Sequence, residues 1–126
     1  MNISAYQTTG IKKLTSLKKD FVPFNFDSEG EKEKALIRDF IHVFCDHQLA
    51  DNDYMNIQLH SHLNDPNAKW FYQLSLEKIL KHITHIIWTD KVVKNYFASK
   101  VKDNTIYHLL NQLEKLETEA SWVNAK

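Results

Sequence analysis

Hydrophobic residues along this chain recur mainly at intervals of three and four, which is the period of an amphipathic α-helix. The pattern is clearest over residues 36–44, 76–87 and 106–116, where charged or polar residues separate the apolar ones. Weaker versions cover residues 11–21 and 92–101. With only two glycines and two prolines, the chain has few turn formers for an all-β domain. The pattern therefore predicts an all-α fold.

Residues that cap helices predict where two of these helices begin. Ser28 and Glu31 form an S-x-x-E capping box, so the second helix is expected to start there and to run to about residue 48. Ser75 is expected to cap a strong helix with a break near residues 89–90.

A short helix is also expected between these two. Asp51 or Asn52 can cap it, and it would end at about Leu59. Its apolar side chains, Tyr54 and Met55 among them, would then face the core.

The length of 126 residues fits one domain that can bury a core without disulfides or metal. We predict a flexible leader over residues 1–10, a single helical domain over 11–118 and a loose tail over 119–126. The domain would be a compact bundle of about five helices joined by short loops.

Charge and cysteine content narrow the function classes. Sixteen basic residues balance sixteen acidic ones, which argues against a general nucleic-acid or membrane binder. Cys45 is the only cysteine, which suits a reducing compartment. No apolar run approaches the roughly 18 residues of a membrane helix, and the first ten residues lack an apolar signal core. We therefore expect a cytoplasmic protein without membrane contact.

Between Phe40 and Leu116 the order of residues resembles a bacterial family of small helical proteins catalogued only as a domain of unknown function. That family shows D-Y, then I-I-R-x-D-R-F-x-x-G, then D-G-x-I-x-x-L-L-x-x-L. The resemblance covers roughly the C-terminal two thirds and implies a helical fold without an activity. The matching pieces are Asp53-Tyr54, Ile86-Ile87, Asp90 and Asp103-Asn104-Thr105-Ile106 with Leu109-Leu110-x-x-Leu113.

The chain departs from that pattern at charged and glycine positions. The family's two arginines fall on Trp88 and Lys91, which removes the planar guanidinium groups that would bind an anion. Its two glycines fall on Asn95 and Asn104. Asparagine tolerates left-handed backbone better than other side chains, so these changes are mild.

Seven histidines raise the possibility of a metal site. His82 and His85 share a helix face, whereas His60 and His62 would share a side only in an extended segment. No glutamate or cysteine accompanies the helical pair at ligand spacing, and lysines on the same face would repel a cation. We expect structural or surface histidines and no cofactor, with a histidine-dependent metal hydrolase as the second alternative function.

Nucleophilic and carboxylate chemistry have little support in the sequence. His47 lies too close along a helix to face Cys45, and Cys45 extends an apolar stripe, so we predict a buried and inert thiol. Asp51 and Asp53 are explained as residues of a helix start. We therefore predict no catalytic residue and a protein that is not an enzyme.

The last predicted helix resembles the recognition helix of some winged-helix repressors. Residues 90–102, the tight connection at 102–105 and this helix could form a helix-turn-helix. Against this, Glu114, Glu117 and Glu119 would oppose DNA phosphates. A small DNA-binding regulator is the first alternative, and its candidate reading residues are Thr105, Tyr107, His108 and Asn111.

Aromatic residues could instead form a surface for a protein partner, because tryptophan and tyrosine bury a large area and keep a polar tip. Trp88 stands where the similar family carries arginine, so it could face solvent. Our leading hypothesis is a non-enzymatic interaction protein, such as an adaptor, inhibitor or immunity-type factor. Its partner would be another protein, with a homodimer as a possibility, and its expected surface comprises Trp88, Asp90, Lys91, Lys94 and Tyr96.

Overall fold

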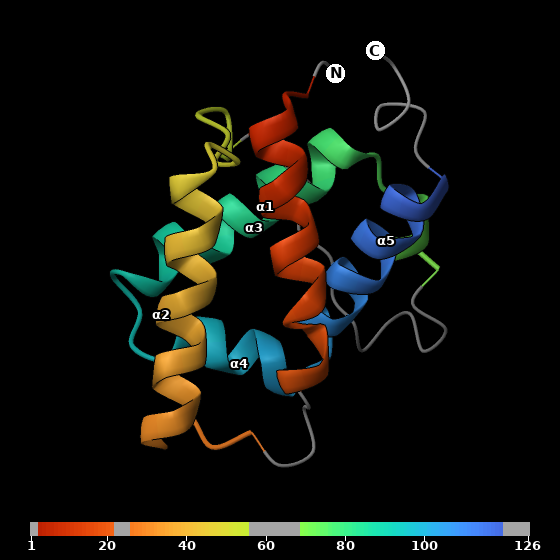
Figure 1. Ribbon diagram of the computed structural model, residues 1–126. Coiled ribbons are helices and arrows are strands. Elements are labelled where there is room, and N and C mark those ends of the chain that lie inside the picture. Colours follow the sequence, from red (N-terminus) through yellow and green to blue (C-terminus); the bar gives the residue numbers. More distant parts are fainter. Residues whose placement is uncertain (1–2, 22–25, 56–68, 120–126) are drawn as a thin grey trace.

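A computed structural model describes residues 3–21, 26–55 and 69–119 (Figure 1). These residues form helices and turns without a strand, which confirms the predicted all-α fold with about five α-helices. None of these helices is both long enough and apolar enough to cross a membrane. The elements are α1 (Ala5–Ser16), the 3-10 helix η1 (Lys18–Asp20), α2 (Glu31–Asp46), the 3-10 helix η4 (Phe71–Gln73), α3 (Leu76–Asp90), α4 (Tyr96–Lys102) and α5 (Thr105–Glu119).

Helix α5 is the element that connects the bundle. It packs against α1, α3 and α4 and against both short 3-10 helices. Helix α2 packs chiefly on α1, and Figure 1 shows these two helices side by side in front of α3 and α4.

The core brings together aromatic rings from distant parts of the chain. The Phe40 ring of α2 meets Phe97 of α4 at 5.2 Å and Phe21 at 5.6 Å between centroids, both edge to face. Such pairs add to the gain from burying apolar area. Around them lie the fully buried apolar residues of the predicted helical stripes, including Ile79, Ile83, Ile87, Ile106, Leu109, Leu110 and Leu113.

The first helix begins earlier than the hydrophobic pattern indicates. Ser4 Oγ accepts a hydrogen bond from the Gln7 amide at 3.0 Å, and Gln7 Oε1 accepts one from the Ser4 amide at 3.0 Å. This capping box starts α1 at Ala5, so most of the predicted flexible leader is helical. Of the predicted loose tail, Glu119 ends α5 and residues 120–126 lie outside the described residues.

The two predicted helix caps have different outcomes. Ser75 caps α3 as expected, because its hydroxyl accepts the Lys78 amide at 3.3 Å, and α3 ends at Asp90. The capping box predicted at Ser28 is wrong, since Gly30 is the N-cap of α2 and no side chain caps it. Asp27 forms the preceding turn instead by accepting the Glu29 amide at 2.9 Å.

The short helix predicted from Asp51 is not formed over the residues that the structure describes there. Asp51 to Met55 form a turn in which the Asp51 carboxylate accepts the Asp53 amide at 2.8 Å. Tyr54 is partly buried, but the Met55 side chain is 72% exposed, so its expected burial is wrong. Leu59 and the rest of that prediction lie outside the described residues.

Both asparagines that replace family glycines adopt left-handed backbone, with φ of 62° at Asn95 and 72° at Asn104. Both positions therefore adopt the left-handed backbone that asparagine tolerates better than other side chains. Asn95 also ends the turn before α4, which begins at Tyr96. The predicted helical start near Val92 is wrong, because a left-handed residue interrupts any helix that would continue from there.

Candidate interaction surface

Three large apolar residues within six positions of the sequence are exposed where α3 ends and the chain turns toward α4. Trp88 is 36% exposed, Val93 48% and Val92 84%. Grouped exposure of this kind is uncommon on a soluble domain and marks binding sites more often than isolated apolar residues do. We define the Trp88 surface as Trp88, Lys91, Val92, Val93 and Lys94.

The turn that carries the Trp88 surface is fixed by hydrogen bonds. The amides of Val92 and Val93 both donate to the Thr89 carbonyl, at 3.0 and 2.8 Å. At its far end, the Asn95 side-chain amide donates to Glu29 at 2.6 Å. The exposed valines are therefore presented by a defined backbone.

A carboxylate links the same turn to the next helix. Asp90 accepts a hydrogen bond from the Phe97 amide at 2.8 Å, which satisfies one free donor of the first turn of α4. Asp90 is partly buried. Asp90 was predicted as part of the interaction surface. In the structure its carboxylate holds α4 against the end of α3.

Basic side chains border the apolar ones. The Lys91 ammonium lies 4.8 Å from the Trp88 ring centroid, within cation–π range. Lys94 is exposed, and its charge contributes, after the Asn95 hydrogen bond and Lys34, to holding the pKa of Glu29 below its usual range. In the described part of the chain, neither Lys91 nor Lys94 forms an ion pair within 4.0 Å.

Other aromatic residues border this surface. Tyr54 lies 6.4 Å from the Trp88 ring, although the sequence analysis assigned it to the core. Tyr96, the last member of the predicted set, is partly buried, and the Lys100 ammonium lies 5.2 Å from its ring. The structure thus places Lys91 against Trp88 and leaves Lys94 exposed three residues further along the same turn. It adds the two exposed valines of this turn, which were assigned to a helix from their spacing.

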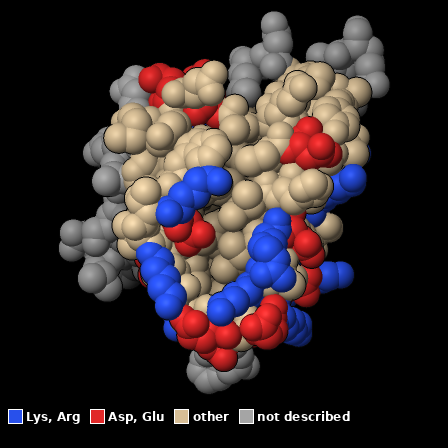
Figure 2. Space-filling model, turned by 90° about the vertical axis from the view of Figure 1, so that its left-hand side faces the viewer, with Lys and Arg blue, Asp and Glu red and all other residues tan. Residues whose placement is uncertain are grey.

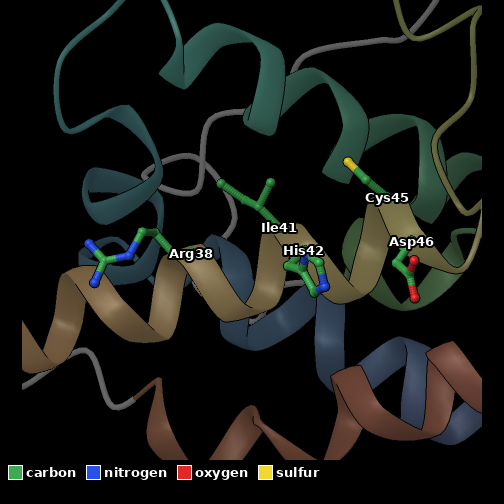
Figure 3. A pocket seen from close by; sticks show the side chains of 5 residues that line it. All are labelled: Arg38, Ile41, His42, Cys45 and Asp46. Atoms are coloured by element: carbon green, nitrogen blue, oxygen red, sulfur yellow. The ribbon is translucent and has the colours of Figure 1, made fainter.

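A hollow of about 520 Å³ runs along α2 and is lined by Arg38, Ile41, His42, Cys45 and Asp46 (Figure 3). Figure 3 shows Ile41 and Cys45 pointing to the side of α2 on which α3 lies. Figure 2 views the molecule from this side, and charged side chains of both signs cover mainly its lower half.

Cys45 is exposed in this hollow, so the predicted buried thiol is wrong. The reason is that Phe40 and Phe44 alone form the fully buried edge of α2, while Ile41 is only partly buried. Cys45 follows Phe44 by one residue, about 100° around the helix, and thereby leaves the packed face. On the other side of the helix end, Asp46 accepts the Tyr6 hydroxyl at 2.9 Å, which raises the pKa of Tyr6.

The two helical histidines contact different aromatic residues. His82 bonds the Lys78 carbonyl through Nδ1 at 2.8 Å and meets the Trp70 ring edge to face. His85 lies near Tyr54, and burial lowers its pKa, with smaller contributions from His82 and Lys100. Across the described ranges, no three His, Cys, Asp or Glu side chains are grouped so that they could hold a metal ion. His60 and His62 lie outside the described residues.

The four candidate DNA-reading residues of α5 do not share an open face. His108 stacks on Phe71, with 5.3 Å between ring centroids, and its Nδ1 lies 3.1 Å from the Tyr72 hydroxyl. Asn111 donates to the same hydroxyl at 3.2 Å. Thr105 is partly buried, whereas Tyr107 is 38% exposed.

These contacts belong to a polar chain that the sequence analysis missed. The Lys18 ammonium donates to Asn111 at 2.7 Å and to Glu114 at 2.7 Å, so a continuous set of bonds joins η1, α5 and η4. The spacing of His108, Asn111 and Glu114 on one helix was a visible signal, but its partners lie far away in sequence. Because these polar side chains hydrogen-bond to one another, we assign this hydrogen-bonded network a structural role.

Comparison with family models, with curated proteins and with solved structures gives no match. The resemblance to the bacterial helical family therefore still rests on the residues quoted for it. Any function has to be argued from the surfaces described above.

Proposed function

We propose that the protein is a non-enzymatic interaction module, such as an adaptor, inhibitor or immunity-type factor, that binds another protein through the Trp88 surface. The observation that carries this proposal is the exposure of Trp88 near the end of α3 and of Val92 and Val93 on the hydrogen-bonded turn that follows. Burying one large apolar side chain against a partner contributes roughly 1.5–3 kcal/mol to the free energy of binding. Tryptophan is also among the residues enriched in binding hot spots.

The proposal accounts for the exposed residues better than the DNA-binding alternative does. His108 and Asn111 are already bonded to Tyr72, so reading bases with them would break bonds inside the protein. The alternative metal hydrolase gains no support from His82 and His85, because within the described ranges they belong to no group of three His, Cys, Asp or Glu side chains that could hold a metal ion. We also propose that the protein acts in the cytoplasm, since its one cysteine is an exposed free thiol.

A photo-crosslinking amino acid at position 92 in the native host tests the proposal. Val92 is 84% exposed, so the replacement leaves the core intact. The matched control carries the same amino acid at Lys12, an exposed position on α1. We expect a discrete protein adduct from position 92 and none from position 12.

The same experiment with Trp88→Ala in the crosslinking chain checks the role of the ring. We expect the adduct to be reduced at least fivefold, while circular dichroism shows the helical content unchanged. Equal labelling from positions 92 and 12, or no adduct from position 92, would overturn the proposal. An adduct of twice the chain mass would place a second copy, and not another protein, on this surface.

A further inference from the structure

We infer that the Trp88 surface binds a short acidic segment of its partner, with one or two large apolar side chains placed among Asp or Glu residues. This inference rests on the proposed function and specifies the chemistry of the partner. The evidence comes from the charges, from the shape of the apolar groups and from the symmetry that a self-contact would require.

The charges on this turn are unbalanced toward the positive. Asp90 is occupied by the Phe97 amide, and Glu29 is shared between the Asn95 amide at 2.6 Å and the Lys34 ammonium at 3.5 Å. Lys91 and Lys94 remain exposed, and within the described ranges no carboxylate lies within 4.0 Å of either ammonium. A chain with zero formal net charge thus presents two exposed lysines, neither in a close ion pair within the described ranges, beside its exposed apolar residues.

Lys91 places the positive charge of this surface next to its apolar part. Its ammonium lies over the Trp88 ring at 4.8 Å from the centroid. An apolar side chain packed against this ring therefore brings its own flanking residues next to the ammonium. Carboxylates at those flanking positions would form charge-assisted hydrogen bonds and speed the encounter.

The apolar groups favour a peptide over a nucleic acid. A single strand binds by stacking successive bases on aromatic rings, but Val92 and Val93 offer methyl groups and no ring. Aliphatic or aromatic side chains of a protein can pack against these methyl groups.

A second copy of this chain is also less favourable. In a two-fold contact the same patch meets itself, so a dimer centred on Trp88 would bring the exposed lysines at 91 and 94 of both copies together. Like charges placed opposite each other oppose association. The surface therefore fits a partner of the opposite charge.

Defined synthetic peptides test the inference by fluorescence anisotropy. The probe is a labelled 14-residue peptide with leucine or phenylalanine at helical spacing and glutamate elsewhere. One matched peptide has lysine in place of glutamate, and another has alanine in place of the apolar residues. A labelled 12-residue oligothymidine serves as the nucleic-acid probe.

We expect the acidic apolar peptide to bind at least tenfold more tightly than the other three probes. The double variant Lys91→Glu with Lys94→Glu should lose this preference and favour the lysine peptide. The control Lys12→Glu with Lys13→Glu makes the same charge change on exposed positions of α1 and should bind as the unaltered protein does.

Equal binding of the acidic and basic peptides, binding of none of the peptides, or tighter binding of oligothymidine would each overturn the inference. So would an equal loss of affinity in the control variant, because the effect would then be one of net charge. Crosslinking from position 92 is independent of these peptides. An adduct there together with failure of the acidic peptide would retain the proposed function and reject only the acidic segment.

Discussion

Replacing Gly10 by alanine should destabilise the protein, although alanine is the better helix former. Gly10 is buried in α1 where this helix crosses the end of α2. A Cβ built at Gly10 would lie 2.6 Å from Cγ of His47 and would also overlap His47 Cβ. His47 is 3% exposed, and its ring stacks on Tyr6 at 4.4 Å between ring centroids.

Two opposing contributions set the change in the free energy of unfolding. Carbon atoms in contact normally lie about 3.5–4.0 Å apart, so the two helices must separate by about 1 Å. Because the opposing Cβ is attached to the backbone, a rotamer change cannot relieve the overlap, and overpacking of this kind costs typically 1–3 kcal/mol. Alanine regains about 1 kcal/mol of helix propensity. The net loss is about 1 kcal/mol, or ~4 °C in Tm for a domain of this size.

Chemical and thermal unfolding followed by circular dichroism measures this difference. Thr9→Ala is the control, since Thr9 is exposed on the same helix turn and its replacement should change stability by no more than about 0.5 kcal/mol. A Gly10→Ala protein that is more stable than the unaltered one would refute the close crossing at His47.

Three further predictions concern features with independent readouts. Cys45 should react with a thiol reagent such as DTNB in the folded protein at a rate near that of the unfolded chain, and protection by more than about tenfold would contradict its exposure. Asn104→Gly should leave stability nearly unchanged, whereas Asn104→Ala should cost about 1 kcal/mol, because φ is 72° there; equal urea midpoints would be evidence against left-handed backbone. Burial lowers the folded-state pKa of His85, so its contribution is fully present above the unfolded pKa of about 6.5 and is lost as pH falls through the folded value. Tm measured at pH 7.5 and 5 should fall less in His85→Gln than in the unaltered protein, and an equal fall in both would exclude this linkage.

The sequence was sufficient for the helices whose stability comes from a regular apolar stripe. In α3 and α5, residues such as Ile83 and Leu109 lie at the helical period and are fully buried. Prediction from the sequence failed where local signals compete with tertiary contacts. The first turn of α1 carries few apolar residues, but Tyr6 bonds Asp46 and Gln7 donates to the Gln48 carbonyl at 2.8 Å.

The candidate surface was predictable only in part, for a related reason. The arginine at that place in the similar family raised exposure of Trp88 as an alternative to core packing, without deciding between them. Val92 and Val93 continue the helical period, so spacing alone assigns them to a buried stripe. Only the left-handed backbone at Asn95 places them in a turn, and asparagine permits that conformation without requiring it.

The central place of α5 has a consequence for synthesis on the ribosome. Thr15 of α1 donates a hydrogen bond to Glu117 of α5 across 102 residues, at 3.3 Å, and α5 packs against α1, α3, α4 and both 3-10 helices. Of the described helices, α5 is translated last. The faces of α1, α3 and α4 that it covers are therefore left without this partner, and open to chaperones, until α5 has been synthesised.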